Sequence, residues 1–212
     1  MTSEISSSAK LTPASWERTL GQVIERIIQG KGRVLLCVTG KPGAGKSTLG
    51  KQIRKKGLVG IPPRKIGVID DGVLSIPFFG LFKRRIKSKA GIQDNLSPFD
   101  QYLKNKKLVV YVNTKPQLRV ERCDVVLHLR CPDEERKQRL IKRELDGEAR
   151  FNCTLNSPDD VVIPADHVFD LCLVASHDRA PQAGAQTALA VASIFIEAGF
   201  HMVNWASRVA DC

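Results

Sequence analysis

The sequence predicts one domain of the α/β class, built on a parallel sheet with helices packed against it. Short apolar runs, of the kind that form buried strands, alternate along the chain with segments whose apolar residues repeat at helical spacing. This alternation is typical of parallel sheets whose strands are connected through helices. The length of 212 residues suits a single domain of this kind.

The first elements are an arm and a helix. Residues 1–10 are rich in serine and are expected to form a loose arm. A helix should begin near Thr12, which can cap it, because apolar residues recur at helical spacing between Trp16 and Ile28. The glycines at positions 30 and 32 should end this helix.

Five apolar runs are expected to form the sheet, and helices are expected between them. The predicted strands are residues 33–39, 65–69, 108–112, 125–129 and 167–174. A helix should follow the first strand and run to about Lys56, and a charged helix should begin after Pro132. A last helix is expected over residues 182–198. In parallel sheets of this kind, ligands bind at the carboxyl ends of the strands.

The most specific motif follows the first predicted strand and has the pattern Gly-x-x-x-x-Gly-Lys-Ser. Its glycines allow the backbone to wrap closely around a phosphate chain, so that N–H groups at the start of a helix point toward it. Lys46 would reach the β- and γ-phosphates, and the Ser47 hydroxyl would bind Mg²⁺. The residues expected to hold the nucleotide are Gly40, Lys41, Pro42, Gly43, Ala44, Gly45, Lys46, Ser47 and Thr48.

In this loop, GKPGAGKST, the sequence resembles the P-loop NTPases, and especially their small-molecule and nucleotide kinases. The resemblance implies a doubly wound sheet of five strands in the order 2-3-1-4-5, with Mg²⁺-ATP as the phosphoryl donor. It extends over about residues 33–200 in the order of elements. Residues 11–212 would form one kinase-like domain, in which residues 72–107 cover the acceptor and residues 132–152 form a lid.

Two acidic residues, Asp70 and Asp71, end the second predicted strand. In kinases that resemble this chain, an acid at this position holds the acceptor hydroxyl or positions Mg²⁺. A carboxylate can orient an acceptor and take its proton. Adjacent strand residues face opposite sides, so one of the two is expected to act, and the sequence does not decide which. The alternative is an ordinary turn at the end of a strand.

Arginines are frequent in the predicted lid. Arg136, Arg139 and Arg143 share one helix face by their spacing, and Arg150 follows. Lid arginines in similar kinases close over ATP and neutralise charge on the transferred phosphoryl group. Arg139 and Arg143 are the predicted catalytic pair. The alternative is an exposed helix stabilised by ion pairs such as Glu135 with Arg139.

Charge is distributed unevenly along the chain. Residues 31–150 carry 28 basic and 12 acidic side chains, whereas residues 151–212 carry 2 and 7. This middle region should attract a polyanionic ligand. Residues 76–89 are basic and apolar, and could contact an anionic acceptor, bind nucleic acid or a membrane surface, or form a solvated face.

The third predicted strand lacks the acid with which many P-loop proteins end it, because Asn113 and Thr114 follow it. Mg²⁺ would then depend on Ser47, on Asp70 or Asp71, and on phosphates and water. This departure disfavours a mechanical or switch ATPase, since such a protein must hold a catalytic water well. It leaves open a protein that binds nucleotide without catalysis.

The predicted function is transfer of the γ-phosphoryl group of Mg²⁺-ATP to a small, anionic hydroxyl or phosphate acceptor, in the cytoplasm. The alternatives are a nucleotide-regulated binding protein, with nucleic acid as a partner that is not favoured, and a sugar-nucleotide kinase resembling zeta toxins. No apolar run has the length of a membrane helix, and no cysteine pair has zinc-ligand spacing. Cys37 and Cys172 are expected in the core as reduced thiols.

Overall fold

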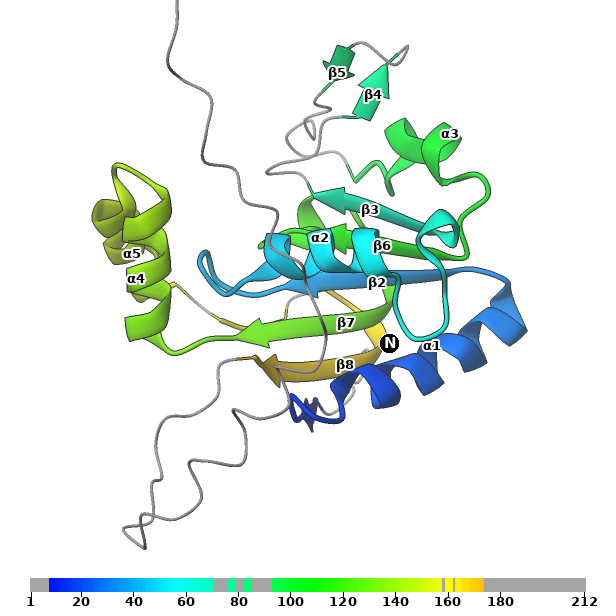
Figure 1. Cartoon of the computed structure of the whole chain (residues 1–212), viewed down its shortest axis with the longest axis horizontal. Coiled ribbons are helices and arrows are strands. Elements are labelled where there is room, and N and C mark those ends of the chain that lie inside the picture. The colour runs from blue at the N-terminus through cyan, green and yellow to red at the C-terminus, as the bar shows by residue number, and fades with distance from the viewer. Residues whose placement is uncertain are drawn as a thin grey trace, which may run out of the picture. The chain divides into compact units, whose positions relative to one another are not determined.

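A parallel sheet of six strands, in the order β1-β8-β7-β2-β6-β3, organises the structure (Figure 1). The structure is a computed structural model, and it describes residues 8–70, 76–78, 82–84, 93–157, 159–161 and 163–173. The strands of the sheet are β1 (Ala9–Leu11), β2 (Val34–Thr39), β3 (Ile66–Asp70), β6 (Leu108–Val112), β7 (Cys123–Arg130) and β8 (Ala165–Cys172).

The five predicted strands are all present and lie in the expected order. They correspond to β2, β3, β6, β7 and β8, and their spatial order β3-β6-β2-β7-β8 is the order 2-3-1-4-5. Every neighbouring pair is parallel. The carboxyl ends of these strands therefore meet at one edge of the sheet, where a ligand is expected.

The sixth strand, β1, is a difference from the prediction. Ala9–Leu11 pairs in parallel with Phe169–Leu171 of β8, whereas the sequence predicts a loose arm over residues 1–10 and no strand before the first helix. A strand of three residues is too short to show a hydrophobic period. It forms because its backbone pairs with the backbone of β8. The Ser8 hydroxyl, which donates a hydrogen bond to the Asp170 carboxylate, also holds it in place. Residues 1–7 of the predicted arm lie outside the described part of the chain.

Two apolar clusters cover the two faces of the sheet. On one face, the inward side chains of the strands pack against α1 (Trp16–Lys31) and α2 (Lys46–Lys56). On the other face, they pack against η2 (Ser97–Phe99) and α3 (Asp100–Leu103). Residues of β2 alternate between the clusters, with Leu36 in the first and Cys37 in the second. Cys37 is buried as expected, whereas Cys172 is only half-buried.

The first helix begins four residues later than predicted. The carbonyl oxygen of Thr12 accepts hydrogen bonds from the N–H groups of Ser15 and Trp16, so Thr12 opens a turn and does not cap the helix with its side chain. The helix ends as expected, since Gly32 has a φ of 75° and its N–H donates to the carbonyl oxygen of Ile28.

The predicted lid contains two helices where one was expected. These are α4 (Asp133–Arg143) and α5 (Gly147–Leu155). The smaller elements are η1 (Pro63–Lys65), η3 (Pro116–Leu118) and an antiparallel pair formed by β4 (Ile76–Phe78) and β5 (Phe82–Arg84).

Some predictions fall outside the described residues. The helix expected over residues 182–198 is one of these, and the predicted acceptor-covering segment is described only in part. Within the ranges that the structure covers, no helix is both long enough and apolar enough to cross a membrane.

Candidate functional site

The glycine-rich loop connects the carboxyl end of β2 to the amino end of α2, as the sequence predicts. Gly40 has a φ of 131°, and a Cβ at this position would lie 2.4 Å from the carbonyl oxygen of Leu129 on the neighbouring strand. Gly43 has a φ of 86°, and its missing Cβ would lie 3.1 Å from the carbonyl oxygen of Arg136. Both positions therefore need glycine for conformation and for close approach.

Lys46 begins α2 and points back into the loop. Its Nζ donates hydrogen bonds to the carbonyl oxygens of Gly40 at 2.7 Å and Lys41 at 2.9 Å. Burial lowers the pKa of Lys46 to about 8, although the negative charge of Asp70 opposes this effect. Nearby Arg143 lowers the pKa further. Because burial is the main cause of the lowered pKa, an anion beside this ammonium group would stabilise its charged form.

A cavity of about 870 Å³ opens beside the loop. Its wall combines the loop with the ends of β3 and β6 and with the two helices of the lid segment. The polar and charged residues outside the loop that line it are Gln52, Asp70, Asn113, Thr114, Arg139, Arg143, Glu144 and Arg150. Gly43 to Thr48, all predicted to hold the nucleotide, line it with Pro42, whereas Gly40 and Lys41 contribute the carbonyl groups that bind Lys46.

The structure distinguishes the two aspartates at the end of β3. Asp70 is the last residue of β3, only 8% of it is exposed, and it lines the cavity. It lies in register with Val112, one strand away from β2. Asp71 lies outside the described residues. Asp70 therefore meets the geometric requirement for a carboxylate that faces a ligand in this cavity.

The lid arginines divide into two groups. Arg139, Arg143 and Arg150 line the cavity. Arg139 is held by Glu135 at 2.9 Å, and Glu144 pairs with both Arg143 and Arg150. These three arginines present their charge to the same space as Lys46.

Arg136 has a structural environment instead. It is 1% exposed, its Nε donates to the carbonyl oxygen of Pro42 at 3.1 Å, and its guanidinium carbon lies 5.3 Å from the centre of the Phe151 ring. It also pairs with Asp133 and donates to the Thr154 hydroxyl. Arg136 therefore fastens the glycine-rich loop to both α4 and α5.

The end of β6 carries amide and hydroxyl groups where an acid is common. The Asn113 side-chain amide donates to the Tyr111 hydroxyl at 2.8 Å, and its Oδ1 accepts the N–H of Lys115. The Thr39 hydroxyl donates to the carbonyl oxygen of Thr114, which connects β2 to β6 beside the loop. Within the described ranges, no group of three His, Cys, Asp or Glu side chains is arranged to hold a metal ion.

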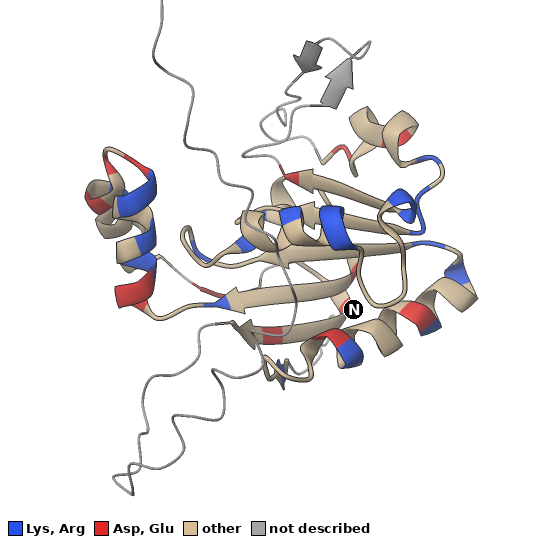
Figure 2. Cartoon of the chain, viewed as in Figure 1, with Lys and Arg blue, Asp and Glu red and all other residues tan. Residues whose placement is uncertain are grey.

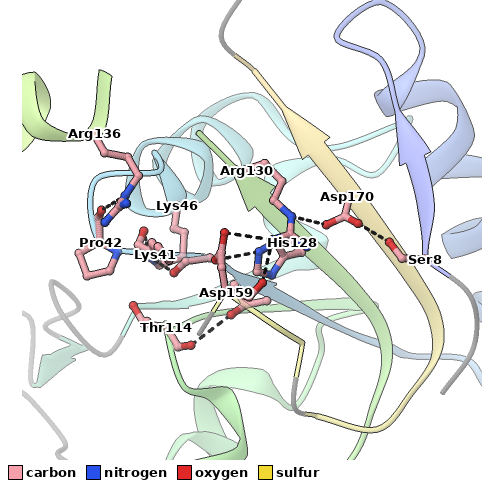
Figure 3. A network of polar contacts seen from close by, with 12 residues as sticks. Ser8, Lys41, Pro42, Lys46, Thr114, His128, Arg130, Arg136, Asp159 and Asp170 are labelled. Carbon is pink, nitrogen blue, oxygen red and sulfur yellow. Dashed lines mark hydrogen bonds and ion pairs between the residues drawn. The ribbon is translucent and has the colours of Figure 1, made fainter. Parts of the chain in front are cut away.

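Behind the loop lies a polar network that sequence reasoning missed (Figure 3). Asp159, in the irregular segment before β8, lies 3.1 Å from Nε2 of buried His128 and 3.0 Å from the Arg130 guanidinium. Arg130 also pairs with Asp170 at 2.9 Å. Burial lowers the pKa of His128, and the charge of Arg130 lowers it further, so the imidazole is neutral near pH 7. His128 does not line the cavity, and its described contact is with Asp159.

Asp159 has an electrostatic effect on the site. Its negative charge raises the pKa of Lys46 and so partly offsets the burial of that ammonium group. No sequence pattern indicates this contact, because Asp159 follows α5 in a segment without regular structure. Glu144 was also missed as a cavity residue, since its sequence neighbours predict only an exposed helix end.

The comparison with protein families agrees with this geometry. A family model described as an AAA domain matches residues 36–151, which is more than half of the chain. The match begins in β2, includes the glycine-rich loop and ends in α5. No curated protein and no solved structure matches the chain significantly. The glycine-rich loop, the sheet and this match together show that the chain belongs to the AAA-domain family of P-loop NTPases.

Proposed function

We propose that the protein is an ATP-dependent phosphotransferase that moves the γ-phosphoryl group to a small, anionic acceptor. The observation that carries this proposal is that three kinds of group face one cavity: the glycine-rich loop, the Asp70 carboxylate and the lid arginines. A phosphoryl transfer needs a donor site, an acceptor site and positive charge between them. The cavity of about 870 Å³ has room for more than one small ligand.

The loop has the chemistry needed to hold the donor. Its positive-φ glycines turn the backbone toward the start of α2, where N–H groups and the helix dipole favour phosphate. Lys46 would exchange the carbonyl oxygens of Gly40 and Lys41 for phosphate oxygens. Phosphate oxygens would also raise the pKa of Lys46, because their negative charge opposes the effect of burial.

Mg²⁺ fits the oxygen groups that border the loop. Mg²⁺ is bound in proteins by one or two oxygen side chains, with phosphates and water completing its shell. Ser47 and Asp70 line the cavity and supply such oxygens. When bound, the ion would neutralise charge on the β- and γ-phosphates.

Asp70 is proposed to orient the acceptor. An acceptor hydroxyl loses its proton to the carboxylate as its oxygen forms a bond to the γ-phosphorus, while the bond from that phosphorus to the bridging oxygen of ATP breaks and ADP leaves. With a phosphate acceptor no proton is transferred, and Asp70 would then act only in positioning or through Mg²⁺.

The lid arginines are proposed to stabilise the transferred group. Arg139 and Arg143 would contact phosphate oxygens as negative charge shifts during transfer. Together with Lys46 and Arg150 they place four cations around the cavity, against the carboxylates of Asp70 and Glu144. This excess of positive charge is the reason for proposing an anionic acceptor.

The test is a mass-spectrometric screen for phosphoryl transfer from Mg²⁺-ATP to the compounds of a cell extract. We expect one class of compound to gain a phosphoryl group with the wild-type protein. It should not do so with Lys46→Ala, and it should do so normally with Lys51→Ala, which changes an exposed lysine of the same helix. Retained ATP binding without any phosphorylated product would refute the transferase and favour a nucleotide-regulated binding protein.

A further inference from the structure

A second concentration of positive charge lies at the opposite end of the sheet from the cavity. It surrounds the amino ends of β2, β3 and β6 and the carboxyl end of α2 (Figure 2). We call this surface the basic edge, and its members are Arg33, Arg54, Lys55, Lys56, Arg64, Lys65, Lys104, Lys106 and Lys107. All are exposed except Lys65 and Lys106, which are half-buried.

Backbone contacts fix the segments that carry these cations against one another. The Arg33 guanidinium donates to the carbonyl oxygens of Leu103, Lys104 and Lys106 at 3.1 to 3.2 Å. Lys106 Nζ donates to the carbonyl oxygen of Arg64 at 2.8 Å. The basic edge is therefore a defined part of the folded sheet, with its cations held in fixed segments.

The basic edge lacks acidic partners. Among the described residues, none of its nine members forms an ion pair with a carboxylate. The neighbouring half of the same sheet end is different, because Lys31 pairs with Asp124 at 2.8 Å and Asp166 at 3.3 Å, and Arg122 also pairs with Asp166. The fold thus neutralises cations at the start of β7 and β8 but not on the basic edge.

Only part of this charge has an internal explanation. Arg54, Lys55 and Lys56 lie in the last turn of α2, where positive charge favours the helix dipole. Of the other six cations, Arg33 and Lys106 bind backbone carbonyl groups, and the remaining four have no side-chain hydrogen bond or ion pair to another described residue. Like charges held close together destabilise a fold. An external polyanion would supply the counter-charge that these residues lack.

We propose that the basic edge binds the phosphate backbone of a nucleic acid without reading its sequence. Contacts between lysine or arginine and phosphate are sufficient for binding of this kind. An anionic membrane is disfavoured because stable binding at a bilayer surface uses apolar side chains as well as charge. The only large exposed apolar residue beside the basic edge, within the described ranges, is Val59, which is 38% exposed and lies over Gly21 of α1.

This binding site is separate from the nucleotide cavity. Helix α2 begins at Lys46 in the cavity and ends at Lys56 on the basic edge. Its eleven residues span about 16 Å. A nucleic acid on the basic edge would leave the cavity open, so the two ligands can be bound together.

The test measures fluorescence anisotropy of a labelled 20-base-pair DNA duplex with the full chain over a range of salt concentrations. The variant is Lys55→Gln/Lys56→Gln/Lys107→Gln. If each lysine contacts one phosphate, the slope of log K against log salt should decrease in magnitude by about 3. The affinity at low salt should fall by at least about tenfold. The matched control, Arg18→Gln/Lys137→Gln/Lys142→Gln, makes the same change in net charge away from the basic edge and should change neither quantity much.

Two readouts keep this test independent of folding and of the proposed phosphotransferase. Both triple variants should unfold within a few degrees of the wild type, since the lost helix-dipole contacts of Lys55 and Lys56 and the lost ion pair of Lys137 with Glu148 each contribute little. Both should bind Mg²⁺-ATP normally, because none of the six residues lines the cavity. Equal loss of affinity in the two variants would overturn the proposal, since net charge alone would then explain binding. Binding to phosphatidylserine vesicles, but not to the duplex, would also overturn it and favour a membrane.

Discussion

Replacing Lys46 with methionine should stabilise the protein in the absence of nucleotide and should remove nucleotide binding. The ammonium group is partly buried and its pKa is lowered from 10.5 to about 8. Since each pKa unit corresponds to 1.36 kcal/mol, a charged Lys46 costs the folded state about 3 kcal/mol at pH 7. Methionine keeps the length of the side chain without the charge. We expect Lys46→Met to raise the free energy of unfolding by about 1 to 3 kcal/mol, because the site relaxes in part.

The pH dependence of this difference has a definite sign. Between pH 8 and 10.5 the unfolded chain binds more protons at Lys46 than the folded chain, so the stability of the wild type increases with pH in this window. The advantage of Lys46→Met should therefore be complete below pH 8 and should disappear toward pH 10.5. Lys51→Met, an exposed change on the same helix, should show neither effect.

Thermal unfolding followed by circular dichroism, with and without Mg²⁺-ATP, measures both parts of the prediction. One kcal/mol corresponds to about 2 to 4 °C for a protein of this size. The nucleotide should raise the unfolding temperature of the wild type and of Lys51→Met but not that of Lys46→Met. A Lys46→Met protein that is no more stable than wild type at pH 7, or whose advantage does not change with pH, would refute the argument from burial.

Three further predictions concern other residues of the site. Arg136→Met should lower the free energy of unfolding by about 3 kcal/mol in urea denaturation, because it removes the link from the loop to both lid helices; a change below 1 kcal/mol would contradict that role. Gly40→Ala should abolish nucleotide binding in calorimetry, since its Cβ would lie 2.4 Å from a carbonyl oxygen, and normal binding would show that the loop adapts. Asp70→Asn should reduce turnover of the phosphorylated acceptor by about 100-fold or more while ATP affinity stays within about threefold; a loss confined to ATP affinity would assign Asp70 to the donor instead.

The sheet could be predicted from sequence because its strands carry their own signal. The strands β2, β6 and β7 carry apolar residues on both faces. A strand that is buried between two layers needs this pattern whatever the arrangement of the other elements, so the pattern can be recognised from the sequence alone. Strand β1 carries no comparable signal, since its pairing with β8 is formed between residues 160 positions apart. Helix α5 was missed for a related reason: Phe151 and Gly147 are its only buried residues, and they pack on α4 and Arg136.

The site was predictable where one short segment forms it, and less so where several segments meet. The loop residues line the cavity because one continuous segment forms the loop, and the Lys46 side chain donates to a backbone carbonyl group of that same segment. The roles of the lid arginines are harder to predict from sequence. Arg136 and Arg139 share one helix face but lie at different positions along the axis of α4. The turn that carries Arg136 lies against Pro42, whereas the next turn reaches Gly43 and the cavity. Only the position of α4 over the loop separates a structural arginine from one that can touch a ligand.

The position of the acid is the strongest argument for transfer to an acceptor over hydrolysis. A hydrolytic P-loop protein must hold a water molecule in line with the γ-phosphate, and an acid at the end of the strand beside β2 commonly supports the metal and that water. Here the neighbouring strand β6 is followed by Asn113, and the carboxylate stands one strand further away, on β3 at Asp70. A group at that distance from the loop leaves space between itself and the phosphates for a ligand larger than water. We therefore expect the protein to hydrolyse ATP slowly when no acceptor is present. Phosphoryl transfer should be faster than hydrolysis once the anionic acceptor fills that space.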